Sequence, residues 1–203
     1  MAMKLNVQQA YDTWSETYDA DDNLTRDLDR TVMGQTLAGR QFEFILEVGC
    51  GTGKNTGLLA ELGERVTAVD FSPGMLAQAQ AKIAAPHVTF QAADITQPWP
   101  VPSASFELVT FNLILEHIED LDFAIGQASR ALKAGGWLFI SELHPFKQYL
   151  GSKARFTHNE KTTFIPAFVH HISDFLQAAQ QHGLALLNLN EWWDVDGEGS
   201  RRA

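Results

Sequence analysis

Short apolar runs alternate with amphipathic segments through most of the chain, from residue 43 to residue 191. Alternation of strands and helices at this spacing is typical of an α/β protein with a parallel sheet and right-handed crossovers. Six runs are short and rich in apolar, β-branched or aromatic residues, as buried parallel strands are. They are Phe44–Val48, Arg65–Phe71, His87–Gln91, Ser105–Asn112, Trp137–Leu143 and Leu184–Asn190.

Three segments between these runs have apolar residues at helical spacing, so that each segment presents one apolar face. Ser72 is the predicted N-cap of the first helix, and Pro73 occupies its first helical position. Gly135-Gly136 and Gly183 are the predicted stops of the second and third helices. The three apolar faces consist of Met75, Leu76, Ala79 and Ile83; Leu121, Ala124, Ile125, Ala128 and Leu132; and Ile172, Phe175, Leu176 and Ala179.

The first part of the chain has a different pattern, because residues 6–39 predict two helices and no strand. Tyr11, Trp14 and Tyr18 fall on one helical face. These aromatic residues either pack against the sheet domain or form a lid over a bound ligand. We therefore expect a single folded unit, with an N-terminal helical cap over residues 1–41 and an α/β domain over residues 42–203.

Composition narrows the class of partner. The 203-residue chain has a formal net charge of −10, which disfavours a nucleic-acid partner because such proteins normally show a basic balance or patch. No apolar run has the length of a signal peptide or a membrane span. A single cysteine forms neither an internal disulfide nor a cysteine-rich metal site. We expect a soluble cytoplasmic protein without a metal, a nucleic-acid partner or a membrane association.

A glycine-rich loop follows the first strand, in the segment ILEVGCGTG. A strand that leads through such a loop into a helix is typical of a nucleotide site. The P-loop pattern fails, because Val48 stands at its first glycine and Asn55 at its Ser/Thr position. The dinucleotide pattern fails at its third glycine, where this chain has Lys54. The pattern that is present is acidic-x-G-x-G-x-G, formed by Glu47, Gly49, Gly51 and Gly53.

Acidic residues also end the next two predicted strands. Asp70 lies 19 residues after Gly51, and a carboxylate there is placed to accept hydrogen bonds from both hydroxyls of a ribose. Asp94 ends the third strand, where it would accept a hydrogen bond from an adenine amino group. Acids at three strand ends suit a ligand that carries sugar, amine and purine donors. They suit a pyrophosphate poorly, because Lys54 is the only cation nearby.

Five segments, in this order and spacing, resemble the class I S-adenosylmethionine-dependent methyltransferases of the type 11 small-molecule kind, which includes quinone-biosynthesis enzymes. The segments are ILEVGCGTG (45–53), VTAVDFSPGML (66–76), VTFQAADI (88–95), FELVTFNLILEHIED (106–120) and ALKAGGWLFISE (131–142). The resemblance covers residues 43–191, and YDTWSETYD (11–19) is also similar to the start of many such enzymes. It implies a Rossmann-like sheet in the order 3-2-1-4-5-7-6, with S-adenosylmethionine as the cofactor and S-adenosylhomocysteine as its product.

The resemblance implies a role for each residue of the cofactor site. Gly49, Cys50 and Gly51 would line the methionine and ribose parts of the cofactor, where a Cβ at either glycine would obstruct it. Glu47 would orient the loop or the cofactor's amino group. The remaining implied contacts are Asp70 and Phe71 at the ribose, Met75, Asp94 and the Ile95 N–H at the adenine, Asn112 at the ammonium group and Tyr18 at the carboxylate.

Four of these residues also have a structural interpretation. Gly53 would allow close packing between a helix and a strand. Cys50 is interpreted as a small buried filler and not as a nucleophile. Asp70 and Asp94 would otherwise cap the helices that follow them, and Met75 would otherwise be a core residue.

A general base is needed only if the acceptor is protonated, because methyl transfer otherwise requires alignment and exclusion of water. His144 and Glu142 follow the fifth strand and His117 follows the fourth, on the side of a parallel sheet where ligands bind. For His117 the orientation of a loop is the favoured alternative. The fourth strand reads FNLILEH and lacks the Asn/Asp-Pro-Pro-aromatic segment of nucleic-acid amino-methyltransferases. A small-molecule acceptor is therefore favoured.

The insertion Pro145–Phe168 has a local charge of +3 and five aromatic residues. It is either a solvated loop that its aromatic residues hold to the domain or a lid over the acceptor. In the second interpretation Arg155 would bind the anionic group of a planar aromatic acceptor, with His144 facing the methyl group. An alternative acceptor pocket lies under Tyr11, Trp14 and Tyr18.

Two other functions stay open: a nucleotide-binding oxidoreductase, and a non-catalytic cofactor-binding or regulatory module, since a fold does not determine function. After Trp192-Trp193 only ten residues follow, DVDGEGSRRA, a polar segment rich in glycine and acid. They are too few for a turn and a buried strand. We therefore expect a six-stranded core from which the seventh strand is absent.

Overall fold

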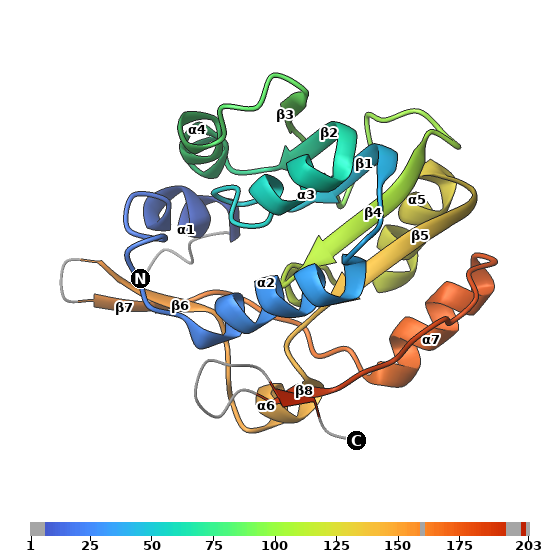
Figure 1. Cartoon of the computed structure of the whole chain (residues 1–203). Coiled ribbons are helices and arrows are strands. Elements are labelled where there is room, and N and C mark those ends of the chain that lie inside the picture. Colours follow the sequence, from blue (N-terminus) through green and yellow to red (C-terminus); the bar gives the residue numbers. More distant parts are fainter. Residues whose placement is uncertain (1–6, 159–160, 194–199, 202–203) are drawn as a thin grey trace.

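A parallel sheet of five strands forms the centre of the computed structural model, which describes residues 7–158, 161–193 and 200–201. The strand order is β3-β2-β1-β4-β5 (Figure 1). The strands are β1 (Phe42–Val48), β2 (Gly63–Asp70), β3 (Val88–Ala92), β4 (Phe106–Asn112) and β5 (Leu132–Ser141). The predicted α/β class and the order 3-2-1-4-5 are confirmed.

Helices cover both faces of this sheet (Figure 1). α2 (Leu24–Leu37), α3 (Thr56–Leu62) and α4 (Pro73–Lys82) lie on one face, and α5 (Leu121–Ala131) and α7 (Ile172–Gln181) lie on the other. Met33 of α2 and Leu59 of α3 pack on Ile45 of β1 without any solvent exposure. On the opposite face, Ala124 and Ala128 of α5 pack on Phe111. Apolar side chains on single faces of these helices therefore build the core, as their spacing predicts.

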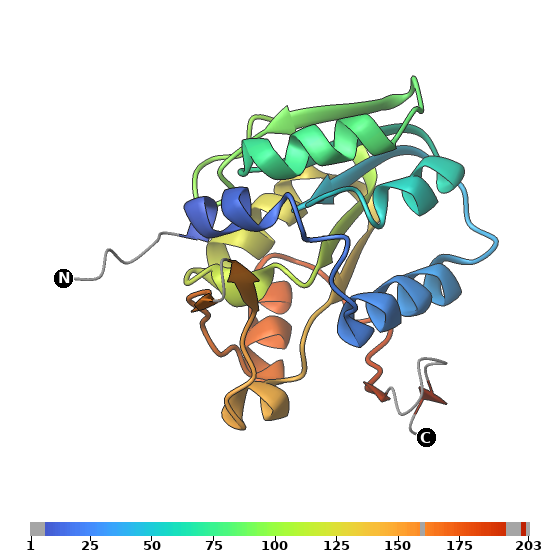
Figure 2. The same ribbon diagram turned by 90° about the vertical axis from the view of Figure 1, so that its left-hand side faces the viewer.

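Two segments lie beyond the carboxyl ends of the strands, as Figures 1 and 2 both show. One is α1 (Val7–Trp14), and the other is the antiparallel hairpin of β6 (Arg155–His158) and β7 (Lys161–Phe164). The predicted insertion therefore has regular structure, which begins with the short α6 (Pro145–Tyr149). Ala10 and Trp14 pack against Phe156 and Ile165 in a separate small apolar cluster.

The structure differs from the sequence prediction in its last third. Leu184–Asn190, the predicted sixth strand, is not a strand: from α7 the chain runs back alongside that helix toward β8 (Figure 1). Leu186, Leu187 and Leu189 are exposed as a result. The prediction that the seventh strand is absent concerns residues 194–203, of which the structure describes only 200 and 201. Of these, Ser200–Arg201 (β9) pairs with Trp192–Trp193 (β8), apart from the main sheet.

Two smaller differences concern helix ends. α5 ends at Ala131, and the predicted stop Gly135-Gly136 lies inside β5 instead. Gly135 has a φ of +80°, and the pairing of β4 with β5 shifts its register between Phe106 and Leu108. The two glycines therefore permit a local irregularity in the strand, and glycine is common at such irregularities. Tyr18 lies beyond the end of α1, in the turn that follows.

Candidate functional site

The order of the strands reverses between β1 and β4, which creates a crevice at their carboxyl ends. The register pairs Val48 of β1 with Val69 on one side and with Phe111 on the other. The residues that follow these three, Gly49, Asp70 and Asn112, therefore lie at the same end of the sheet. In open α/β sheets, ligands bind in this crevice.

The three glycines of the loop all have positive φ, of +77°, +52° and +80°, a region that other residues rarely adopt. A Cβ on Gly51 would meet no atom within 4 Å, so this side of the loop is open. A Cβ on Gly49 would lie 2.0 Å from Ile114 Cδ1, so the protein itself excludes a side chain there. A Cβ on Gly53 would lie 3.3 Å from Ala79 Cβ of α4, so close packing explains this glycine, although against a helix and not a strand.

Asp70 is buried at the end of β2 and holds the loop in place. Its Oδ2 accepts a hydrogen bond from the Gly51 N–H at 2.8 Å, and its Oδ1 accepts one from the Ser72 N–H at 2.9 Å. Burial raises the pKa of this carboxyl, while the two N–H donors act in the opposite direction. Phe71 is half-buried next to it, with its ring 6.4 Å from that of Tyr11 in an edge contact.

The residues predicted at the adenine differ in exposure. Asp94 is exposed, and its Oδ1 accepts hydrogen bonds from the Thr96 N–H at 3.0 Å and the Thr96 hydroxyl at 2.7 Å. Ile95 and Met75 are buried, and the Met75 N–H is capped by the Ser72 hydroxyl. Cys50 is buried among Ala68, Leu76 and Phe90, and burial raises the pKa of its thiol well above the ordinary value.

Two glutamates lie near the strand ends, the buried Glu47 and the half-buried Glu142. Glu47 accepts a hydrogen bond from the Thr56 hydroxyl at 2.6 Å, which ties the end of β1 to the start of α3. Glu142 accepts hydrogen bonds from the N–H groups of Ile114 and Leu115 at 2.9 and 2.8 Å, and so holds the loop after β4. Burial raises the pKa of each of the two carboxyls to about 8. Both therefore bind a proton around neutral pH in the ligand-free protein.

Helix α2 brings two further charged residues to the site that sequence reasoning missed. Arg26 and Asp29 are 8% and 6% exposed. The Arg26 guanidinium stacks 4.0 Å over the Tyr18 ring, and its Nε has no partner among the described residues. Asp29 accepts hydrogen bonds from the side-chain amides of Asn55 and Asn112. A signal was present in the sequence, because both residues share the helical face of Met33.

An aromatic cluster covers this region and joins α1 to the insertion. Trp14 stacks on Phe156 of β6 with ring centroids 5.4 Å apart and an interplanar angle of 16°. The Tyr11 hydroxyl lies 2.8 Å from His117 Nε2, and His117 Nδ1 lies 2.9 Å from the Pro166 carbonyl oxygen. A carbonyl only accepts, so Nδ1 carries the hydrogen and Nε2 accepts from Tyr11. His117 therefore links three segments, in keeping with the loop-orienting role that the sequence favours.

His144 and Arg155 lie on the outer part of the insertion. His144 caps α6: its Nδ1 accepts a hydrogen bond from the Phe146 N–H at 3.1 Å, while its Nε2 lies 2.6 Å from Glu191 Oε1. Both ring nitrogens thus have partners. Arg155 is exposed on β6. The roles of these two residues toward an acceptor stay predictions.

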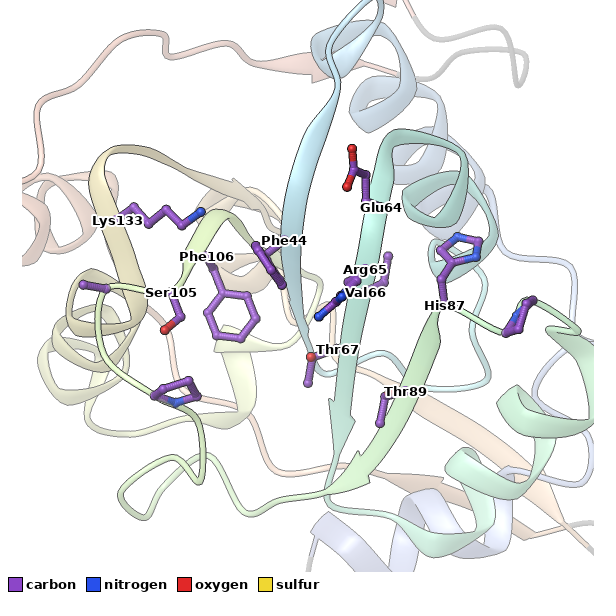
Figure 3. A pocket seen from close by; sticks show the side chains of 13 residues that line it. Phe44, Glu64, Arg65, Val66, Thr67, His87, Thr89, Ser105, Phe106 and Lys133 are labelled. Carbon is purple, nitrogen blue, oxygen red and sulfur yellow. The ribbon is translucent and has the colours of Figure 1, made fainter.

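A groove of about 690 Å³ lies at the opposite end of the sheet, where residues 93–105 connect β3 to β4 without a helix (Figure 3). Phe44, Arg65, Thr89 and Lys133, all near the starts of their strands, contribute to its lining. Lys133 pairs with Glu107 at 3.1 Å and with Glu43 at 3.7 Å. Because Lys133 is paired with these glutamates and Glu64 also lines the groove, the groove carries no excess positive charge that would bind an anion.

Two features are absent from residues 7–158, 161–193 and 200–201: a membrane-spanning helix and a cluster of metal ligands. None of the helices there is long and apolar enough to cross a membrane. No group of three or more His, Cys, Asp or Glu side chains there is placed to hold a metal ion.

Comparison with known proteins places this chain among methyltransferases. The family profile described as "Methyltransferase domain" matches residues 46–140. A malonyl-[acyl-carrier protein] O-methyltransferase of Serratia marcescens is 34% identical over 142 residues, which are 69% of this chain and 53% of the relative. A ubiquinone biosynthesis O-methyltransferase of Coxiella burnetii is 32% identical over 161 residues, which are 76% of this chain and 67% of the relative.

Solved structures show the same fold. The DhpI–SAH complex matches with a TM-score of 0.69 and 22% identity, over 87% of this chain and 85% of that chain. At this identity the likeness establishes the fold alone. The chain spans about half the length of the Serratia relative, so what the relatives do as whole proteins does not transfer directly.

Proposed function

This chain belongs to the class I S-adenosylmethionine-dependent methyltransferases, and on that premise we propose that it transfers the methyl group of S-adenosylmethionine to a small-molecule acceptor. One observation carries the proposal. At the point where the strand order reverses, Asp70 holds the Gly51 N–H at 2.8 Å while the other side of Gly51 is open. A buried carboxylate and an open glycine loop fit the ribose end of this cofactor.

The polar groups present also fit the amino-acid end of the cofactor. The buried Oδ1 of Asn112 has no partner among the described residues, and an ammonium group would supply its missing donor. The buried Arg26 guanidinium donates hydrogen bonds from Nη1 and Nη2 to the carbonyl oxygens of Tyr18 and Asp21, while its Nε has no partner among the described residues, so Nε is available to a carboxylate. We propose Arg26, with Tyr18 beneath it, as the group that binds the cofactor's carboxylate.

The bound cofactor supplies an electrophilic methyl group on a positively charged sulfur. The protein has to align the acceptor with that methyl group and to exclude water. Asp70 would orient the ribose, and the cluster around Trp14 and Phe156 would close the site from above. If the acceptor carries a proton, the groups that we propose for its removal are His117 and His144, and Glu142 once it has lost its own proton.

For the acceptor we propose an oxygen atom of a small molecule. Both relatives described above are named O-methyltransferases. An anionic aromatic acceptor remains our proposal for the substrate class. Its support is that the insertion that carries Arg155 and three lysines also supplies Phe156 to the aromatic cluster of Tyr11 and Trp14.

Calorimetry tests the cofactor assignment. S-adenosylmethionine and S-adenosylhomocysteine should bind to the wild-type protein, and NAD should not. Asp70→Ala should weaken binding of S-adenosylmethionine by roughly 1–3 kcal/mol, because hydrogen bonds to a charged group are lost. Glu61→Ala, at an exposed acid near the end of α3, is the control and should leave the affinity unchanged. If Asp70→Ala binds S-adenosylmethionine as tightly as the wild-type protein does, the assignment of Asp70 to the cofactor site is wrong.

A second experiment separates an enzyme from a non-catalytic module on the same fold. The protein is incubated with labelled S-adenosylmethionine and a panel of phenols and carboxylic acids, and release of S-adenosylhomocysteine is measured. Turnover with any acceptor establishes the enzyme. Tight cofactor binding without turnover across the panel favours the module.

A further inference from the structure

Asp29 of α2 connects three parts of the protein at the floor of the crevice. Its Oδ1 accepts a hydrogen bond from Asn112 Nδ2 at 2.7 Å, and its Oδ2 accepts one from Asn55 Nδ2 at 2.8 Å. Asn112 ends β4, and Asn55 precedes α3 at the end of the glycine loop. The Ser141 hydroxyl, at the end of β5, also interacts with this carboxyl. One carboxylate from the N-terminal segment thus fixes side chains on both sides of the crevice.

The negative charge of Asp29 determines which way the two amides point. A carboxylate only accepts hydrogen bonds, so each asparagine must turn its NH₂ group toward Asp29. Each amide oxygen must then point away from Asp29. These two oxygens, Asn55 Oδ1 and Asn112 Oδ1, are buried and have no partner among the described residues. Buried polar atoms normally have partners, so two unpaired acceptors on amides that one carboxylate orients indicate that a donor is still to be bound.

The strand register locates the second of these acceptors. Asn112 directly follows Phe111, which pairs with Val48, so it lies beside Gly49 where the strand order reverses. Asp70, the proposed ribose ligand, begins the same crevice on the other side of β1. A donor at Asn112 therefore belongs to the same ligand as the ribose. In S-adenosylmethionine the group with several donors, away from the sugar, is the ammonium of the amino-acid end.

We infer that Asp29 is a positioning residue for the cofactor: it holds the amides of Asn112 and Asn55 with their oxygens directed at the ammonium group. The inference rests on the proposed function. It also assigns a purpose to a charged residue on the apolar face of α2, since a leucine there would fill the space but leave both amides unoriented. The N-terminal helical segment then completes the cofactor site and does more than cover it.

The test compares two ligands that differ only at the amino-acid end. S-adenosylhomocysteine carries the ammonium group, whereas 5′-methylthioadenosine has the same base, sugar and sulfur without it. Asp29→Asn keeps the shape of the side chain but removes the charge that orients the two amides. We expect Asp29→Asn to raise the Kd of S-adenosylhomocysteine by about tenfold or more and to leave the Kd of 5′-methylthioadenosine within about twofold.

Two further variants make the result specific. Asp27→Asn changes an exposed acid on the same helix, which pairs with Lys54, and should alter neither Kd. Asn112→Ala removes one of the acceptors with Asp29 intact, and it should show the same selective loss. It also serves as the test if Asp29→Asn does not fold, which a thermal melt would show.

The outcomes separate the two levels of the argument. A parallel loss for both ligands would mean that Asp29 only stabilises the fold, and an unchanged Kd for both would mean that it has no role in the site. Either result overturns the inference while the proposed function stands. If the wild-type protein binds neither ligand, the proposed function itself fails, and the inference fails with it.

Discussion

Glu47 shows how a single side chain couples the site to pH. It is 3% exposed, and burial raises the pKa of its carboxyl from 4.5 to about 8. The folded protein therefore binds this proton more tightly than the unfolded chain does. The stabilisation is fully present below about pH 4.5 and is lost as the pH rises through 8.

We expect the free energy of unfolding of the ligand-free protein to fall between pH 5 and pH 8. Glu47→Gln cannot ionise, and its amide oxygen still accepts from Thr56, so this variant should lose that part of the slope. A shift of this size corresponds to roughly 3–5 kcal/mol across the range. Urea unfolding at several pH values measures it, with Glu61→Gln at an exposed position of α3 as the control. Parallel pH profiles for wild type and Glu47→Gln would contradict the expectation.

At the scale of elements, α1 and the β6–β7 hairpin stabilise each other. Trp14 is 5% exposed and Phe156 is 4% exposed, and their rings stack. α1 is also attached to α4, because Asp12 accepts hydrogen bonds from the Ser72 hydroxyl at 2.5 Å and the Gly74 N–H at 3.1 Å. The hairpin has no such attachment to the main sheet in the pairing of its strands. Its position depends on the aromatic contact with α1 and on hydrogen bonds of the segment after β7, where the Pro166 carbonyl accepts from His117 Nδ1 and the Phe168 N–H donates to the Glu116 carbonyl.

Phe156→Ala should release the hairpin from α1. Loss of a buried phenylalanine costs about 3–5 kcal/mol in a well-packed core, which exceeds what a two-stranded ribbon supplies by itself. Hydrogen exchange should accelerate in both α1 and the hairpin, with β1 and β4 unchanged. Phe164→Ala in the same hairpin is the control, because Phe164 is 58% exposed. Unchanged protection of α1 in Phe156→Ala would show that the two elements are independent.

The elements also show where sequence reasoning succeeds. The first five strands were predictable because each is short and rich in apolar, β-branched or aromatic residues, and β1, β2 and β4 are buried at most of their positions. The three amphipathic helices were predictable because one face of each packs on the sheet. Leu184–Asn190 has the same composition as those strands but no position in the sheet. Local composition does not encode that difference. Whether the segment joins the sheet depends on the direction in which the chain leaves α7.

The candidate site was predictable to the extent that its residues adjoin strands. Asp70 and Asn112 were identified because parallel strands bring their carboxyl ends together. Arg26 and Asp29 were missed because a helix residue reaches the site only through the packing of α2 on the sheet. The hairpin in residues 155–164 was missed because its strands are short and pair only with each other.

For the whole molecule, charge is the property that bears most on ligand choice. The chain has a net charge of −10, and three buried acids, Asp29, Glu47 and Asp70, lie around one crevice with the half-buried Glu142. Such a site favours a cation once its acids ionise. S-adenosylmethionine has a positive sulfonium, whereas its product S-adenosylhomocysteine has a neutral sulfur.

We therefore expect the ratio of the two affinities to depend on pH. Between pH 6 and pH 8, where Glu47 and Glu142 begin to ionise, binding of S-adenosylmethionine should strengthen relative to S-adenosylhomocysteine by several-fold. Calorimetry in buffers of different ionisation enthalpy would also detect the proton released on binding. Glu142→Gln should reduce the change in the ratio. A constant ratio across this range would show that the sulfur does not experience these acids.

The contact between Trp14 and Phe156 also bears on how the protein is made. The two residues are 142 positions apart in the chain, and a ribosome adds about 5–20 residues per second. α1 therefore leaves the ribosome roughly 7–30 seconds before the strand that its tryptophan stacks on. During that interval the aromatic side chains of α1 are exposed to chaperones and to other nascent chains. Biosynthesis thus delays closure of the site until the hairpin has emerged.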